Sequence, residues 1–275
     1  MASVETSDGH SLYTEAHGEG IPILFSCPLN TTRENWRPQV EPLVAAGFRV
    51  VLWDYRGHGR SDAPDDPDAY HMEQVLDDLG RVLDWAAAGE PAVLAGLSLG
   101  GLVSLHFAYR HPERVLALVL IDSGPGFKNP EAKQRWQLSC DKTSSYLESK
   151  GLAAFVKSKA SAMTVGTRPE LPAARTALAA IALQQAHGLA HFGRRVAGPA
   201  PPMIDELAEI EVPALILVGE HDHAYLRAAE LMASRLPRAE SVTLLGATHV
   251  VNIEAAEAFN TAVLRFLEKI RVEAA

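Results

Sequence analysis

The chain has 275 residues, of which 47% are hydrophobic and 21% charged, with 34 acidic against 25 basic side chains. A chain this apolar, with a net charge of −9, is not expected to be disordered. Two Cys and an aperiodic set of 20 Gly and 17 Pro exclude disulfide scaffolds and collagen-like proteins. The acidic balance argues against a nucleic-acid partner, because it would repel phosphates. Composition therefore predicts a globular protein and favours an α/β enzyme.

Apolar runs and helical patterns alternate along the chain. At its start, Ser3–Ala16 carries Asp8-Gly9 at a turn position and predicts a β-hairpin. Runs that are apolar on both faces predict strands at Ile21–Phe25, Phe48–Trp53, Ala92–Leu97, Val115–Ile121, Pro213–Val218 and Ser241–Leu245. Amphipathic segments predict helices at Arg33–Ala46, Tyr70–Ala88, Leu99–Arg110, Leu226–Arg235 and Glu254–Lys269. This alternation predicts a mostly parallel, doubly wound α/β sheet.

The alternation fails between residues 128 and 208. That segment is rich in Ala, has a helical pattern and is broken at Arg168–Pro172 and Gly198–Pro202. It is too long for a loop inside a compact sheet, so we expect a helical cap inserted over the strand ends. Residues 1–127 and 209–275 would then form the core.

The sequence carries few signs of export or membrane contact. Its first twenty residues are polar, without the basic start and apolar core of a signal peptide. No apolar stretch approaches the roughly 20 residues that a bilayer span needs. Cys27 and Cys140 are expected to be free thiols in a reducing compartment. We therefore expect a cytoplasmic protein that contacts no membrane.

The sharpest motif is Gly96-Leu97-Ser98-Leu99-Gly100-Gly101, between a predicted strand and a predicted helix. It fits Gly-x-Ser-x-Gly, the nucleophile elbow, in which a tight turn brings backbone segments together and requires small residues beside the serine. The serine hydroxyl then projects at a helix N-terminus, where free N–H groups favour developing negative charge. We predict that Ser98 is a nucleophile.

A serine hydroxyl needs a base, and the base needs an orienting acid. Asp222 follows the Pro213–Val218 strand, and His249 follows the next strand, 27 residues further on. Both should reach the sheet edge that carries Ser98. Because the elbow is typically followed by the acid and then by the histidine, we predict a catalytic triad of Ser98, Asp222 and His249.

Neighbouring residues leave alternatives open. Asp122, at the end of the Val115–Ile121 strand, is a second candidate for the acid, although we expect it to cap the following turn. His221 and His223 flank Asp222, but such adjacent residues alternate faces, so no metal site is expected. His58 is expected to hold its turn together rather than to react. No Gly-Lys-Ser/Thr nucleotide motif occurs, and no cofactor is expected.

Stabilising a tetrahedral oxyanion requires two donors. The N–H of Leu99, directly after the nucleophile, supplies one. The other should follow the Ile21–Phe25 strand, where the loop reads Ser26-Cys27-Pro28-Leu29-Asn30. Pro28 has no N–H, so we assign the second donor to Leu29.

Taken together, these motifs resemble the α/β-hydrolase superfamily over nearly the whole chain. The match includes Asp54-x-Arg56-Gly57-His58-Gly59-x-Ser61, the elbow at Ser98, Gly219-x-x-Asp222 and His249-x-x-Asn252-x-Glu254. Within the superfamily, Ser26-x-x-Leu29-x-Thr31-Thr32 ending at Trp36 is similar to the 3-oxoadipate enol-lactonase group. Pro28, Asn30 and the insertion depart from that group's pattern. The resemblance implies ester or lactone hydrolysis through an acyl-enzyme on Ser98, with His249 as base.

The predicted cap offers candidate substrate contacts. Trp136, Phe155 and Phe192 are aromatic residues that could line a pocket or pack the cap on the sheet. Arg135, Arg194 and Arg195 could receive a substrate carboxylate, but solvated helix faces are the favoured interpretation.

Three hypotheses follow for function. The first is hydrolysis of a small carboxylic ester or lactone. The second is another reaction of the same triad, such as C–C bond hydrolysis, perhydrolysis or acyl transfer. The third, from a different class, is a ligand-binding receptor of hydrolase fold, which an intact triad disfavours. A small-molecule substrate is the one partner expected.

Overall fold

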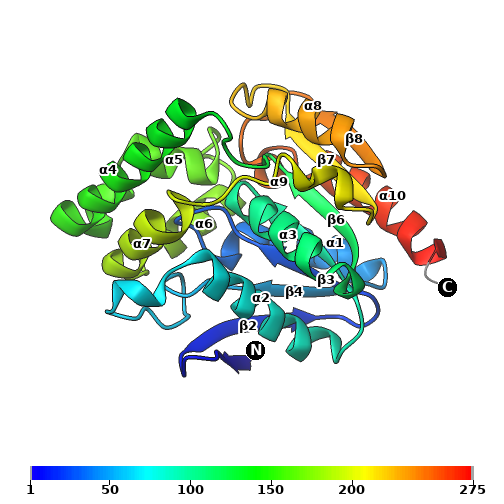
Figure 1. The fold of residues 1–275 in the computed structure, drawn as a ribbon, viewed down its shortest axis with the longest axis horizontal. Helices are drawn as coiled ribbons and strands as arrows, with labels where there is room; N and C mark the ends of the chain where they lie inside the picture. Colours follow the sequence, from blue (N-terminus) through cyan, green and yellow to red (C-terminus); the bar gives the residue numbers. More distant parts are fainter. Residues whose placement is uncertain (1, 274–275) are drawn as a thin grey trace.

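The computed structural model describes residues 2–273, apart from the side chains of Ala162 and Met163. Its centre is an eight-stranded sheet in the order β1-β2-β4-β3-β5-β6-β7-β8, with helices on both sides (Figure 1). The strands are β1 (Ala2–Glu5), β2 (Ser11–His17), β3 (Pro22–Ser26), β4 (Arg49–Trp53), β5 (Ala92–Leu97), β6 (Val115–Ile121), β7 (Ala214–Gly219) and β8 (Ala239–Leu244). The predicted mostly parallel α/β sheet is confirmed.

Strand direction follows the apolar pattern of the sequence. β1 and β2 form the predicted antiparallel hairpin, and β2 pairs antiparallel with β4. From β4 to β8 every neighbouring pair is parallel. The central strands β5 and β7 are buried along their whole length, as expected for strands with helices on both faces.

The helices of the sheet region lie close to the predicted ranges. They are α1 (Arg37–Ala45), α2 (Met72–Ala87), α3 (Leu99–Arg110), α8 (Leu226–Arg235), α9 (Val251–Glu254) and α10 (Ala256–Glu273). The helix predicted at Arg33–Ala46 begins as a 3-10 turn, Arg33–Trp36, capped by the Thr32 side chain. The helix predicted to begin at Glu254 is divided by the non-helical Ala255 into α9 and α10. α1 and α10 contact each other, and α2 contacts α3.

Between β6 and β7 the chain forms a group of helices that lies beside the sheet (Figure 1). These are α4 (Pro130–Phe155), α5 (Lys159–Val165), α6 (Pro172–Ile181) and α7 (Ala186–Phe192). Gly151, at φ 73°, interrupts α4. These helices form their own apolar cluster, joined by Val250 and Ile253 from the segment after β8. Shorter turns lie at Pro67–Ala69, Pro112–Arg114, Gly193–Ala197 and Glu206–Glu209.

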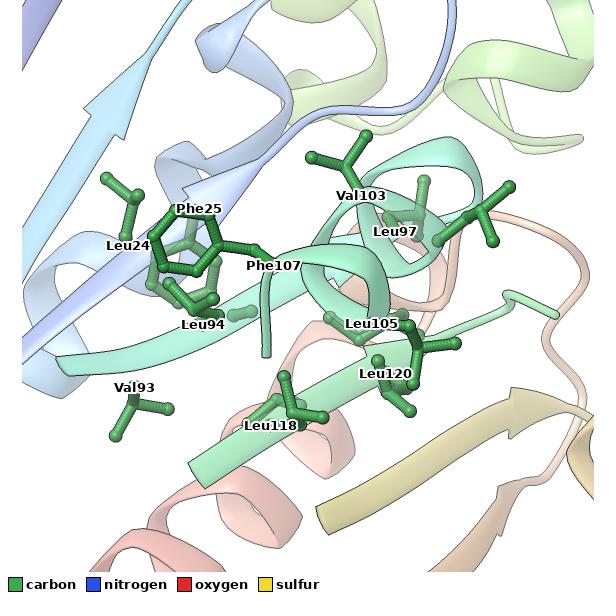
Figure 2. Close-up of a cluster of buried hydrophobic side chains, with 14 of the residues drawn as sticks. Leu24, Phe25, Val93, Leu94, Leu97, Val103, Leu105, Phe107, Leu118 and Leu120 are labelled. Carbon is green, nitrogen blue, oxygen red and sulfur yellow. The ribbon is translucent and has the colours of Figure 1, made fainter. Parts of the chain in front are cut away.

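The main core lies beneath the turn from β5 to α3. Figure 2 shows apolar side chains of β3, β5, β6 and α3 gathered in one cluster. In it, Phe25 of β3 and Phe107 of α3 are almost completely buried. Burial of this surface holds α3 firmly against the strands on which its N-terminus depends. No helix within residues 2–273 is long and apolar enough to cross a membrane.

A fully buried ion pair anchors the turn after β4. Arg56 donates through Nε and Nη2 to the two carboxylate oxygens of Asp78 on α2, at 2.7 and 2.8 Å. Its Nη1 also donates to Asp8 in the hairpin turn and to the Ala69 carbonyl, at 2.8 and 2.7 Å. One guanidinium therefore joins the hairpin, α2 and the turn that carries His58.

We predict that Asp78→Asn lowers the free energy of unfolding by about 3 kcal/mol or more, because it leaves the buried Arg56 charge without its main partner. The matched control is Glu240→Gln, which removes the partner of exposed Lys269 and should cost at most about 1 kcal/mol. Urea denaturation measures both. Equal losses in the two variants would contradict this account of the buried pair.

Candidate active site

Ser98 occupies a strained turn between β5 and α3. Its φ of 55° and ψ of −116° are unusual for a residue with a side chain. A Cβ on Gly96 would lie 2.2 Å from the Gly100 backbone, and one on Gly100 would lie 2.3 Å from the Ser26 carbonyl oxygen. Only glycine fits at these two positions, which is the requirement that identified the elbow in the sequence.

The predicted acid and base lie next to each other. Asp222 follows β7 in a turn in which its N–H donates to the Gly219 carbonyl at 3.0 Å. His249 follows β8, and its Nδ1 lies 2.7 Å from Asp222 Oδ2. With a proton on Nδ1 donated to the carboxylate, Nε2 of His249 is left as the basic nitrogen. Ser98, Asp222 and His249 all line one cavity of about 460 Å³.

Tyr225 is a residue of this cavity that sequence reasoning missed. Its hydroxyl lies 3.4 Å from Ser98 Oγ, and its ring stacks on that of His249 with centroids 4.9 Å apart. The turn at Asp222 fixes it, because the Tyr225 N–H donates to the Asp222 carbonyl at 2.9 Å. Burial raises the pKa of Tyr225, so its hydroxyl stays protonated at neutral pH. The sequence signal that could have identified Tyr225 is its position three residues after the predicted acid, Asp222.

Asp122 is completely buried and joins the acid and base loops. Its Oδ1 accepts from the Gly219 N–H at 2.8 Å, and its Oδ2 accepts from the Val251 N–H at 3.4 Å. Burial, together with the neighbouring Asp222 carboxylate, raises the pKa of Asp122 well above its usual range. The alternative acid therefore lies behind Asp222, while the hydrogen bond to His249 is made by Asp222 itself.

The structure shows what the two polar residues of His249-x-x-Asn252-x-Glu254 bind. Asn252 donates to the backbone oxygen of Asn35 at 2.8 Å. Glu254 accepts from the backbone and hydroxyl groups of both Thr248 and Thr167, and so joins the base loop to the segment before α6. Although burial opposes its ionisation, these hydrogen bonds lower the pKa of Glu254.

The loop after β3 borders the same cavity as Ser98. Leu29 and Leu99, the two predicted oxyanion donors, both line the cavity with Ser98. The loop is tight: Asn30 has a φ of 64°, and the Thr31 hydroxyl donates to the Pro28 carbonyl at 2.9 Å.

His58 holds this loop from behind. Its Nε2 accepts from the Asn30 N–H at 3.3 Å, while its Nδ1 lies 3.2 Å from the Arg56 carbonyl. This pair of contacts requires the neutral imidazole with its proton on Nδ1. Burial, opposed by the hydrogen bond to Arg56, lowers the pKa of His58 to about 4. His58 thus connects its turn to the oxyanion loop, as a structural rather than a reacting group.

The three aromatic residues proposed as substrate contacts lie in different places. Trp136 lines the cavity, and its Nε1 donates to the Ala197 carbonyl at 2.7 Å. Phe155 is buried in the apolar cluster of the helical group, and Phe192 packs edge-on against His58 at 4.6 Å. Phe155 thus packs the helical group together, whereas Phe192 packs α7 against the turn after β4, and both rings are almost completely buried.

Metal-ligating groups and thiols complete the description of the site. Among the described side chains, no group of three or more His, Cys, Asp or Glu could hold a metal ion. Cys27 and Cys140 are free and buried, as expected from the sequence.

We predict that His58 makes folding pH-dependent. Unfolded His58 binds a proton near pH 6.5 but folded His58 only near pH 4, so the free energy of unfolding falls as the pH drops between these values. The slope from this residue is at most about 1.4 kcal/mol per pH unit. His58→Gln, which can keep a donor and an acceptor but does not titrate, should show a shallower decline between neutral pH and pH 5 in chemical denaturation.

Comparing the variant with wild type isolates the contribution of His58 to the pH dependence of the free energy of unfolding. Burial also lowers the pKa values of His106 and His191, but both remain in the two proteins, so their contributions cancel. Identical slopes in wild type and His58→Gln would show that His58 is not the titrating group.

Comparisons with known proteins agree with the observed fold. The sequence profile of the α/β hydrolase fold matches residues 22–256. A candidate carbamate hydrolase, RutD, of Rhizobium rhizogenes is 33% identical, over 93% of this chain and 97% of that protein. The enol-lactonase of Burkholderia xenovorans LB400 is 28% identical with a TM-score of 0.81, covering 97% of this chain and 100% of that one. A thermophilic esterase from Thermogutta terrifontis has 25% identity and a TM-score of 0.85, covering 98% of both chains.

The profile match covers most of the chain, and the eight-stranded sheet agrees with it. The protein therefore belongs to the α/β-hydrolase superfamily, among relatives that are hydrolases.

Proposed function

We propose that this protein is a serine hydrolase that cleaves a small carboxylic ester or lactone. The observation that carries the proposal is the Asp222–His249 hydrogen bond of 2.7 Å, in the same cavity as a serine on a strained elbow. The names of the similar proteins, which include an enol-lactonase and an esterase, support the reaction class.

In the first half-reaction, His249 Nε2 takes the proton of Ser98 as Oγ attacks the carbonyl carbon. The N–H groups of Leu29 and Leu99 stabilise the oxyanion, each contributing about 3–4 kcal/mol to lowering the barrier. His249 then protonates the leaving oxygen as its bond to carbon breaks. In a lactone that oxygen stays attached to the acyl chain.

In the second half-reaction, His249 takes a proton from water, whose oxygen attacks the acyl carbon. The bond to Ser98 Oγ breaks, the proton returns to Oγ through His249, and the carboxylic acid leaves. Asp222 keeps the proton on Nδ1 and stabilises the imidazolium that forms in each half-reaction.

The helical segment between β6 and β7 supplies one wall of the cavity. We assign residues 128–208 to a cap and residues 1–127 and 209–275 to the catalytic core. Trp136 on α4 is the proposed aromatic contact for substrate, because it lines the cavity that contains Ser98. Tyr225, which contacts both Ser98 and His249, is proposed to contact substrate from the core side.

We predict that wild type hydrolyses 4-nitrophenyl acetate and butyrate and that Ser98→Ala abolishes this turnover. A fluorophosphonate should label wild type at Ser98, and His249→Ala should lose the label because the hydroxyl is no longer activated. Mass spectrometry of the labelled peptide measures the site. Turnover that persists in Ser98→Ala would contradict the assigned nucleophile.

We also predict unequal effects for the two acids. Asp222→Asn should lower kcat by about 10⁴-fold, because the amide no longer fixes the correct tautomer. Asp122→Asn should lower it by less than about tenfold, because an amide resembles the protonated carboxyl that burial favours. The matched pair is compared in kcat and by circular dichroism. A larger loss in Asp122→Asn would make Asp122 the orienting acid.

A further inference from the structure

Few residues with formally charged side chains line the cavity beside Ser98. Its apolar lining includes Leu29, Leu102, Phe127, Trp136, Ala197 and Ala228. Neutral polar groups come from Asn30, Ser139, Thr143, Ser144 and Thr164. The formally charged residue types among the lining are the proposed acid and base, Asp222 and His249, and the lining recorded for the described residues contains neither Lys nor Arg.

The arginines that could have met a substrate carboxylate are occupied elsewhere. Arg194 makes two hydrogen bonds with Glu148, at 2.7 and 2.9 Å. Arg195 is bound to Asp68. Arg135 lies 4.0 Å from Glu131, and its side chain is 71% exposed. The three form ion pairs on the surface, in agreement with the favoured interpretation from the sequence.

The lysines next to lining residues also lie outside the cavity. Lys142 and Lys159 are exposed, and exposed Lys128 is bound to Asp205 at 2.7 Å. A carboxylate buried beside Trp136 would therefore have hydroxyl and amide donors but no cationic partner. Burial of a charge without a partner is costly, and the Asp222 carboxylate in the lining of the same cavity adds repulsion.

We propose that the site selects substrates whose acyl group is uncharged and mainly apolar, and that it discriminates against acyl groups that end in a carboxylate. The inference rests on the proposed function and specifies its substrate class. The volume of about 460 Å³ lies in the lower part of the usual range for small-molecule sites, roughly 300–1,000 Å³. The hydroxyl groups of α4 can satisfy a neutral carbonyl or hydroxyl group on the substrate.

The test uses three esters with one leaving group: 4-nitrophenyl pentanoate, mono-4-nitrophenyl glutarate and 4-nitrophenyl methyl glutarate. The first two have acyl chains of equal length and differ in ending with a methyl or a carboxylate group. The third restores neutrality to the glutarate chain while adding bulk. We expect kcat/KM for the free carboxylate to be lower than for pentanoate by about 100-fold or more. The methyl ester should lie within about tenfold of pentanoate.

A variant with an added positive charge tests the cause. Thr143→Arg places a cation in the lining and should shift the glutarate-to-pentanoate ratio of kcat/KM toward glutarate by about tenfold or more. The matched control, Leu138→Arg, adds the same charge to an exposed position of α4 and should leave the ratio unchanged.

Each outcome decides a separate question. Similar kcat/KM values for all three esters would overturn the charge selectivity while leaving the hydrolase proposal standing. A methyl ester as poor as the free acid would also overturn it, because bulk would then be limiting. Hydrolysis of none of the esters, with Ser98 unlabelled by a fluorophosphonate, would overturn the proposed function and the selectivity together.

Discussion

Close contacts at three glycines, two with backbone and one with a side chain, determine how near the surrounding loops lie to Ser98. A side chain on Gly100 would meet the Ser26 carbonyl, so this glycine lets the loop of Leu29 approach the elbow. A side chain on Gly101 would meet Ser123, directly after Asp122. A side chain on Gly219 would lie 2.2 Å from the Thr248 carbonyl, so this glycine lets the base loop lie against the end of β7. Any larger residue would separate the loops on which the chemistry depends.

Polar contacts then fix the loops that the glycines bring together. Asp122 holds the end of β7 and the start of α9, His58 holds the loop of Leu29, and Glu254 holds Thr248. Each is buried, so its contacts are stronger than they would be in water, and an unmet partner would be expensive. Apolar packing positions the helices and strands, whereas these directional contacts orient individual backbone groups. The proposed chemistry needs this directional placement, because a reacting serine, its base and the oxyanion donors must be aligned with one another.

The features that could be predicted from the sequence are those that require a local pattern of residue types. The elbow at Ser98 depends on glycines two residues away, and the positions of the strands follow from short apolar runs, so both could be predicted. Phe155 and Phe192 could not be assigned in the same way, because a buried ring and a pocket ring have the same sequence signature. Whether an arginine such as Arg194 faces a cavity or a glutamate on another helix depends on packing between distant segments. Tyr225 was missed because its contact with Ser98 arises from the turn at Asp222.

Charge balance connects the buried acids with the choice of substrate. Burial raises the pKa of Asp122 well above its usual range and so favours the neutral form of this second acid beside Asp222. In the proposed mechanism, His249 becomes positive when Ser98 attacks and offsets the Asp222 carboxylate, while backbone N–H groups stabilise the new oxyanion. An ionised Asp122 would leave the group with excess negative charge, and a substrate carboxylate in the cavity would do the same. In the proposed mechanism an ionised Asp122 and a substrate carboxylate would therefore carry the same electrostatic cost, because the described lining of the cavity supplies no Lys or Arg to offset a further negative charge.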